Sequence, residues 1–294
     1  MDDDQIEVVI QKQTGIALSK LNEYKTKQIH LKRPVFFVPG WCDEPCGWWI
    51  GPYQGIQGIF QWISQIADNP KEAIYIEFNN ESPQCNSFLE FGQVLKNKIW
   101  AAIGKDQPFD LVGHSMGGLN IRAALTQEDP LLNCQSCITA DTPHQGDNDG
   151  KFLELAKEFN PSSVASITPY QLKQVQNMCP TNLPIQTINH LDSRQLFLSR
   201  VNKFYQFKGT RDWVVMDSCF MDMTEISDSY SQKVASISVE GCEHIWTKGI
   251  TLDVRTILAI VYMIQGIEIP SANNHGILPD GNYTPPDDNE IFIG

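Results

Sequence analysis

FDLVGHSMGGLNIRAAL, residues 109–125, joins a short apolar run to a helix-like segment through the sequence Gly-His-Ser-Met-Gly. A serine nucleophile on a sharp strand-to-helix turn requires this pattern, because the strained backbone leaves room only for small residues two positions before and after it. Gly113 and Gly117 occupy these positions around Ser115, and Gly118 is a further small residue. The N-terminal N–H groups of the following helix would favour negative charge that develops beside the serine. We therefore interpret Ser115 as a catalytic nucleophile; the alternative is a tight turn that contains an inert serine.

Short β-branched runs alternate with helix-like segments along most of the chain. The predicted strands are PVFFVP (34–39), AIYIEF (73–78), FDLVG (109–113), SCITA (136–140), KFYQFKG (203–209) and KVASISVE (233–240). The predicted helices lie near 53–68, 87–103, 115–127 and 249–264. Several of the runs are apolar nearly throughout, as strands covered on both faces are. The alternation predicts an α/β fold with a mostly parallel, doubly wound sheet and helices on both faces.

The predicted core is interrupted once and extended at both ends. The segment 147–200 is several times longer than the roughly twelve residues that a parallel crossover needs. Its length predicts an inserted cap or lid. The alternative is an insertion that has no part in the site. The core then comprises 33–146 and 201–265, and residues 1–32 form an N-terminal helical arm. Residues 266–294 are polar and proline-rich, and we expect a loosely packed C-terminal tail.

A serine nucleophile needs a histidine base and an acidic residue that orients it, and the chain order in this architecture is serine, acid, histidine. His244 directly follows the run KVASISVE and is the preferred base, whereas His275 lies in the polar tail. Asp212 follows the end of a predicted strand and is the preferred acid. Asp217 and Asp141 are the alternatives, Asp141 because it too ends a strand.

An acyl-transfer site also needs two N–H donors for the oxyanion of the tetrahedral intermediate. One is expected to be the N–H of Met116, directly after the serine. The other is expected to be the N–H of Trp41, because Gly40 lets the backbone turn after the first predicted strand. Trp48 and Trp49 follow closely, and they either wall an acyl pocket or belong to the core or an interface.

The composition limits the partners and the location. The formal net charge of −13 argues against phosphate backbones and anionic lipid surfaces, so no nucleic-acid partner is expected. The acidic start, MDDDQIEVVI, lacks the basic and apolar regions of a signal peptide, which predicts a cytoplasmic location, or secretion if a leader has been removed. The most apolar segment, 249–264, carries Asp253 and Arg255 and is too short to span a bilayer. We expect a core helix there and no integral membrane association.

Two cysteine pairs have spacings that metal sites use, C-x-x-C at Cys134 and Cys137 and C-x-x-x-C at Cys42 and Cys46. Because Cys137 lies in a predicted strand, where neighbouring ligands splay, we favour reduced thiols over disulfides or a zinc site. No metal and no cofactor are expected; a calcium ion on the acidic tail segment PDGNYTPPDD is the alternative.

These residues resemble the α/β-hydrolase superfamily in its lipase and esterase branch. GHSMGG is similar to the lipase nucleophile turn, DTPHQG (141–146) to a Thr-Pro-His segment of bacterial lipases, and PVFFVPGW to the oxyanion strand and loop. Pro39 stands where the common form of that loop has histidine. The resemblance covers about 33–265 and implies a lid-bearing carboxylic ester hydrolase in which His144 is structural or lines the site. The candidate substrate-binding residues are Gly40, His114, His144 and Trp48.

The predicted reaction is hydrolysis of a small-molecule or lipid ester through an acyl-enzyme on Ser115, with Asp212 and His244 completing a Ser-His-Asp triad. A thioesterase or acyltransferase would use the same residues. A ligand-binding protein on a hydrolase scaffold is the alternative from another class. The polar stretch of the insert around 171–177 favours short acyl chains or a soluble substrate.

Overall fold

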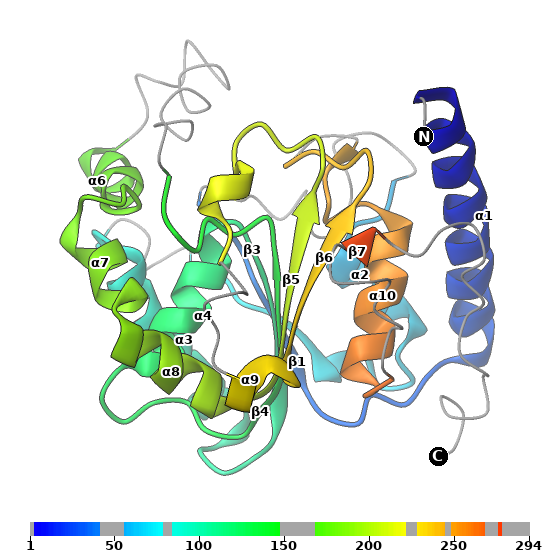
Figure 1. The fold of residues 1–294 in the computed structure, drawn as a ribbon. Helices are drawn as coiled ribbons and strands as arrows, with labels where there is room; N and C mark the ends of the chain where they lie inside the picture. Colours follow the sequence, from blue (N-terminus) through cyan, green and yellow to red (C-terminus); the bar gives the residue numbers. More distant parts are fainter. Residues whose placement is uncertain are drawn as a thin grey trace.

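A parallel β-sheet forms the centre of the molecule (Figure 1). The computed structural model describes residues 3–41, 56–78, 84–147, 168–221, 228–244, 248–267 and 276–277. Within these residues the sheet has seven strands in the order β2-β1-β3-β4-β5-β6-β7, and every neighbouring pair is parallel. The strands are β1 (Val35–Val38), β2 (Ala73–Tyr75), β3 (Phe109–His114), β4 (Cys134–Ala140), β5 (Val201–Gly209), β6 (Val234–Val239) and β7 (Gly276–Ile277). The predicted parallel α/β sheet is confirmed, with each of the six expected strands in place.

The apolar runs form strands because both faces of the sheet are covered. All four residues of β1 and all six of β3 are buried. One apolar cluster contains Phe36, Leu111 and Cys137, and a second contains their sequence neighbours Phe37, Val112 and Ile138. Alternate residues of each central strand therefore enter opposite layers of the core.

Helices cover the two faces of the sheet (Figure 1). On one face lie α3 (Phe88–Ile103), α4 (Met116–Thr126), α6 (Pro169–Asn177), α7 (Leu183–Asn189) and α8 (Leu191–Arg200). On the other lie α1 (Asp3–Lys27), α2 (Ile59–Ile66) and α10 (Val254–Ile264). The remaining short helices are η2 (Pro70–Glu72), η4 (Asp217–Cys219) and α9 (Asp228–Ser231).

The apolar segment predicted as a helix over 249–264 begins later, at Val254. Asp253 ends the preceding turn and caps α10, since its carboxylate accepts hydrogen bonds from the N–H groups of Arg255 and Thr256. The buried Arg255 guanidinium binds the same carboxylate and the carbonyl of Glu240, so both charges are paired. No helix among the described ranges is long and apolar enough to cross a membrane.

The predicted arm, insert and tail all contact the core. Helix α1 packs on α10 and α2, with Leu21 and Tyr24 fully buried. Helices α7 and α8 pack against α4, and Phe197 of α8 is fully buried. The part of the insert from 148 to 167 lies outside the described residues, and its role as a cap remains a prediction.

The expected loose packing of the C-terminal tail does not extend to β7. Gly276 and Ile277 pair with Ile237 and Ser238 at the open edge of β6. Edge strands leave backbone N–H and C=O groups without partners, and a short added strand covers them. This pairing depends on a distant edge, which a local proline-rich composition does not reveal.

Burial also affects the protonation of the Cys134 and Cys137 thiols. Both side chains lie in β4 with almost no exposed surface. Burial raises the pKa of both thiols, which opposes the thiolate form that zinc requires. The structure therefore favours protonated thiols at these positions, whereas Cys42 and Cys46 lie outside the described residues.

Candidate active site

Ser115 occupies a strained turn between β3 and α4. Its φ of 53° and ψ of −129° are rare for a residue with a side chain, and its N–H donates to the carbonyl of Ala140 in β4 over 2.9 Å. Since β3 ends at His114 and α4 begins at Met116, the serine is the only residue between the two elements. This geometry is the sharp strand-to-helix turn that the Gly-x-Ser-x-Gly pattern predicts.

Gly117 is required by close packing against the end of β1. A Cβ atom at this position would lie 2.2 Å from the carbonyl oxygen of Val38 and 2.6 Å from that of Pro39. Both are backbone atoms, so the clash could be relieved only by moving β1 or α4. The first turn of α4 is thereby held against the segment that leads to Gly40.

We expect Gly117→Ala to lower the free energy of unfolding by about 3 kcal/mol or more, because the new methyl group overpacks two backbone carbonyls. Gly15→Ala is the matched control, because Gly15 lies within α1 and a Cβ atom there would enter open space, with no packing atom within 4 Å. This control should be neutral or stabilising by up to about 1 kcal/mol. Denaturant unfolding followed by circular dichroism measures both. Equal stability of the two variants would contradict the packing argument.

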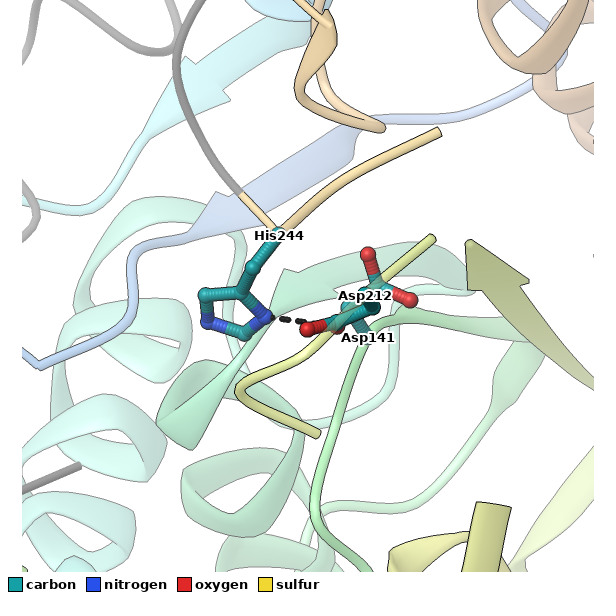
Figure 2. A group of neighbouring side chains, drawn as sticks. All are labelled: Asp141, Asp212 and His244. Carbon is teal, nitrogen blue, oxygen red and sulfur yellow. Dashed lines mark hydrogen bonds and ion pairs between the residues drawn. The ribbon is translucent and has the colours of Figure 1, made fainter. Parts of the chain in front are cut away.

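Ser115, His244 and Asp212 form a continuous hydrogen-bonded chain. The serine Oγ lies 3.0 Å from Nε2 of His244. Nδ1 of His244 lies 2.9 Å from Oδ2 of Asp212, the contact that Figure 2 marks with a dashed line. The side chains of His244 and Asp212 are 3% and 0% exposed. Because Nδ1 faces a carboxylate, it carries the ring proton, and Nε2 is left to accept a proton from the serine hydroxyl.

Asp212 is positioned by its own loop as well as by the imidazole. Its Oδ1 accepts hydrogen bonds from the N–H groups of Val214 and Val215, at 2.8 and 2.9 Å. The loop follows β5, and the N–H of Asp212 donates to the carbonyl of Gly209. The carboxylate is thus held in one orientation toward His244.

His114 contacts His244. Its Nε2 lies 3.1 Å from the carbonyl oxygen of His244 and donates to it, and the two rings lie 4.8 Å apart between centroids. His114 was expected among the substrate-binding residues, and the structure places it where it can hold the backbone of His244.

Gly40 lies directly against the serine. A Cβ atom at Gly40 would be 2.8 Å from Cβ and 3.4 Å from Oγ of Ser115. The absence of a side chain at Gly40 therefore lets the loop after β1 approach Ser115. Trp41 is the next residue of this loop. The indole N–H of Trp41 donates to the carbonyl of Gln171 in α6 over 3.1 Å, which connects this loop to the predicted cap. Trp48 lies outside the described residues.

His144 belongs to a buried polar network on the α4 side of the sheet. Its Nε2 lies 3.0 Å from Oγ1 of Thr139, its ring packs edge-on against Phe204, and the side chain has no exposed surface. Burial, with the nearby Arg122 charge, lowers the pKa of His144 well below its usual range. The neutral ring contacts this network, and none of these partners is Ser115, Asp212 or His244.

Arg122 is the centre of that network. Its guanidinium donates to the carbonyls of His144 and Ile188 and to the side-chain oxygen of Asn189, at 3.0, 2.7 and 3.1 Å. Burial lowers the pKa of Arg122 to about 9, so the group still carries its charge at neutral pH. Arg122 was not singled out from the sequence, although it is the one charged residue of α4, whose other polar side chains are Asn120 and Thr126.

We expect Arg122→Ala to lower the free energy of unfolding by roughly 2–4 kcal/mol, because it leaves two buried carbonyls without donors. Arg211→Ala removes an exposed arginine and should change stability by less than about 0.5 kcal/mol. Thermal and denaturant unfolding of both variants gives the comparison. A wild-type stability for Arg122→Ala would mean that water or neighbouring groups replace the guanidinium.

The alternative acids and the alternative base occupy different surroundings. Asp217 is exposed and paired with Lys208. Asp141 is buried close to Asp212 (Figure 2). His275 lies outside the described residues.

Asp141, Asp212 and His244 are also the one set of three potential metal ligands found in the described ranges, with ligand atoms within 4.8 Å of one another. Two of the three are already bound to each other through the His244–Asp212 hydrogen bond.

Comparisons with known proteins bear on the family and the fold of this chain. A family model for palmitoyl protein thioesterase matches residues 34–206, more than half of the 294 residues. The mature lipase BlEst2 of Bacillus licheniformis has a similar structure, with a TM-score of 0.50, 15% identity, and coverage of 80% of this chain and 92% of the lipase. Phospholipase PlaB of Legionella pneumophila also has a similar structure, with a TM-score of 0.51 and 13% identity. The similar part covers 80% of this chain and 60% of the phospholipase. No curated protein sequence matches significantly.

At such low identity the two structures bear on the fold alone, and they agree with the α/β-hydrolase fold expected from the sequence. The family match covers β1 to the centre of β5 and includes Ser115. The family match supports a hydrolase of the esterase and thioesterase type. The chain belongs to the palmitoyl protein thioesterase family.

Proposed function

We propose that this protein hydrolyses acyl thioesters, and carboxylic esters by the same route, through an acyl-enzyme on Ser115. The observation that carries the proposal is the hydrogen-bonded chain from Ser115 through His244 to Asp212. It provides a nucleophile, a base and an orienting acid in one line.

In the first step, Ser115 Oγ attacks the acyl carbonyl while Nε2 of His244 takes the hydroxyl proton. Asp212 stabilises the imidazolium that forms and keeps its Nδ1 proton directed away from the serine. The negative charge on the carbonyl oxygen needs N–H donors. Met116 is suited to this role because the N–H groups in the first turn of a helix have no acceptor within it. Trp41, after Gly40, is the proposed second donor.

Collapse of this intermediate breaks the bond to sulfur or oxygen and leaves the acyl group on Ser115. His244 returns its proton to the leaving group, then takes a proton from water as the water attacks the acyl-enzyme. The second collapse releases the carboxylic acid and restores the serine. A thiolate leaves more readily than an alkoxide, so thioesters depend less on proton donation by His244.

The family supports thioesters as the substrate class, and the net charge of −13 favours a neutral acyl group and carrier over a polyanionic one. We propose that the segment 147–200 forms the cap over the acyl group. The support is the contact of Trp41 with Gln171, together with the exposed apolar side chains of Tyr170, Leu172 and Leu183 on α6 and α7.

The test compares two substrates that share one acyl group, an S-acyl N-acetylcysteamine and the corresponding p-nitrophenyl ester, in a series from acetyl to palmitoyl. We expect serine-dependent turnover of both, with kcat/KM higher for the thioester at the preferred chain length. Turnover of the esters alone would assign a lipase or esterase activity. Absence of turnover with both, while the acyl compounds still bind, would favour a binding protein.

A further inference from the structure

Asp141 is a buried acidic residue that the proposed mechanism does not use. It directly follows β4, has a φ of 45°, and has no exposed surface. Its N–H donates to the carbonyl of Phe207 over 3.0 Å, which holds this conformation between β4 and β5. A positive φ is uncommon for a residue with a side chain, although aspartate and asparagine tolerate it better than most.

The two carboxylate oxygens of Asp141 have unequal surroundings. Oδ1 accepts a hydrogen bond from the N–H of Gly209 over 2.7 Å. Oδ2 is buried, and among the described residues no N–H or O–H group donates to it. A buried carboxylate oxygen without a donor is unfavourable, whereas a protonated one can itself donate.

The natural acceptor is the neighbouring carboxylate of Asp212. Oxygen atoms of the two residues and a ring nitrogen of His244 lie within 4.8 Å of one another, and Figure 2 shows the two carboxyl groups side by side. Two carboxylates this close in a buried site cannot both ionise without a large cost, so they share one proton.

The hydrogen bonds indicate which residue carries that proton. Asp212 accepts three N–H groups, from Val214, Val215 and His244, and so is stabilised as an anion. Asp141 accepts one, from Gly209. The shared proton therefore belongs on Oδ2 of Asp141.

We propose that Asp141 is a neutral carboxylic acid whose O–H donates to the carboxylate of Asp212, and that it is a positioning residue for the acid of the triad. The proposal rests on the proposed function. With one proton on Asp141, the two carboxyl groups carry a single negative charge opposite the imidazolium that forms on His244. The O–H of Asp141 is then a fourth hydrogen-bond donor that holds Asp212 in place.

The charged and titratable groups around Asp141 agree with this assignment. Burial, and next the negative charge of Asp212, raise the pKa of Asp141 well above its usual range, while Lys208 on β5 acts in the opposite direction. From the loop after β6, Cys242 has a thiol whose pKa burial also raises, so it contributes no negative charge at neutral pH. The third neighbouring group, the His244 imidazole, is hydrogen-bonded to Asp212.

The first experiment compares two substitutions of Asp141. Asp141→Asn keeps the shape, offers an amide N–H to Asp212, and still accepts from Gly209, so we expect kcat within about threefold of wild type. Asp141→Gly removes the donor but tolerates a φ of 45°, so the chain should still fold, and kcat should fall by about 10- to 100-fold, as for a lost hydrogen bond to a charged group. KM should change little, because Asp141 is not proposed to touch the substrate.

The second experiment detects the proton directly. The infrared difference spectrum between wild type and Asp141→Asn at neutral pH should contain the C=O stretch of a protonated carboxylic acid, which shifts in heavy water. Asp106→Asn, at an exposed position, is the control for the subtraction. A spectrum that contains only carboxylate bands would overturn the proposal.

The kinetic outcomes separate this proposal from the proposed function. If Asp141→Asn is as inactive as Asp212→Asn while both fold, Asp141 acts as an ionised acid and the assignment is wrong. If Asp141→Gly retains the wild-type kcat, Asp141 does not position Asp212 and the proposal is wrong. If Ser115→Ala remains active, the proposed function fails, whereas the infrared band of Asp141 would be unaffected.

Discussion

Replacing Ser115 with alanine is expected to lower kcat by about a million-fold, because the acyl-enzyme can no longer form and only background hydrolysis remains. The substitution removes one hydroxyl group and keeps the Cβ atom on the strained turn. The loss of its hydrogen bond to His244 should therefore shift the melting temperature by no more than about 2–4 °C. Steady-state hydrolysis of the preferred thioester and differential scanning calorimetry measure the two effects.

Ser199→Ala is the matched control, since this serine in α8 is exposed and its hydroxyl donates within its own helix, to the carbonyl of Leu196. It should leave turnover and stability unchanged. Activity of Ser115→Ala near that of the control would reject the assignment of the nucleophile.

Asp212→Asn is expected to lower kcat by about 10⁴-fold with little change in KM. The amide oxygen would accept the hydrogen bonds from the N–H groups of Val214 and Val215, as Oδ1 of Asp212 does. The amide NH₂ group would therefore face Nδ1 of His244. The imidazole would then carry its proton on Nε2, where it could not accept the proton of Ser115. The fold should remain intact, because asparagine has the same shape.

Asp217→Asn is the control for this variant. Asp217 lies five positions further along the chain, at the start of η4, but it is exposed and paired with Lys208. An exposed pair contributes little, so both activity and stability should stay near wild type. A large loss in Asp217→Asn, with activity retained in Asp212→Asn, would reassign the acid.

The sheet could be predicted because the local sequence of each strand indicates whether its two faces are buried. A run such as VFFV at 35–38 is apolar on both sides, and in a parallel sheet both sides are indeed covered. The turn at Ser115 is equally local, since the glycines that it needs are within two residues of it. The structure also brings together Ser115, Asp212 and His244, whose order along the chain already indicated a common edge of the sheet.

The remaining features depend on contacts between distant segments. The position of Asp141 close to Asp212 requires the register of β4 against β5, which places Ala140 opposite Phe207. Arg122 joins α4 to the carbonyl of Ile188, 66 positions away. The start of α10 at Val254 was missed although its cap, Asp253, is visible in the sequence, because the apolar composition before it suggested helix.

Labelling with a fluorophosphonate, located by peptide mass spectrometry, identifies the nucleophile of this protein. We predict one adduct per chain, on the peptide that carries Ser115, with the rate of labelling strongly reduced in His244→Ala and in Asp212→Asn. Folded protein that hydrolyses acyl thioesters yet remains unlabelled, or carries the adduct on another residue, would show that Ser115 is not the nucleophile.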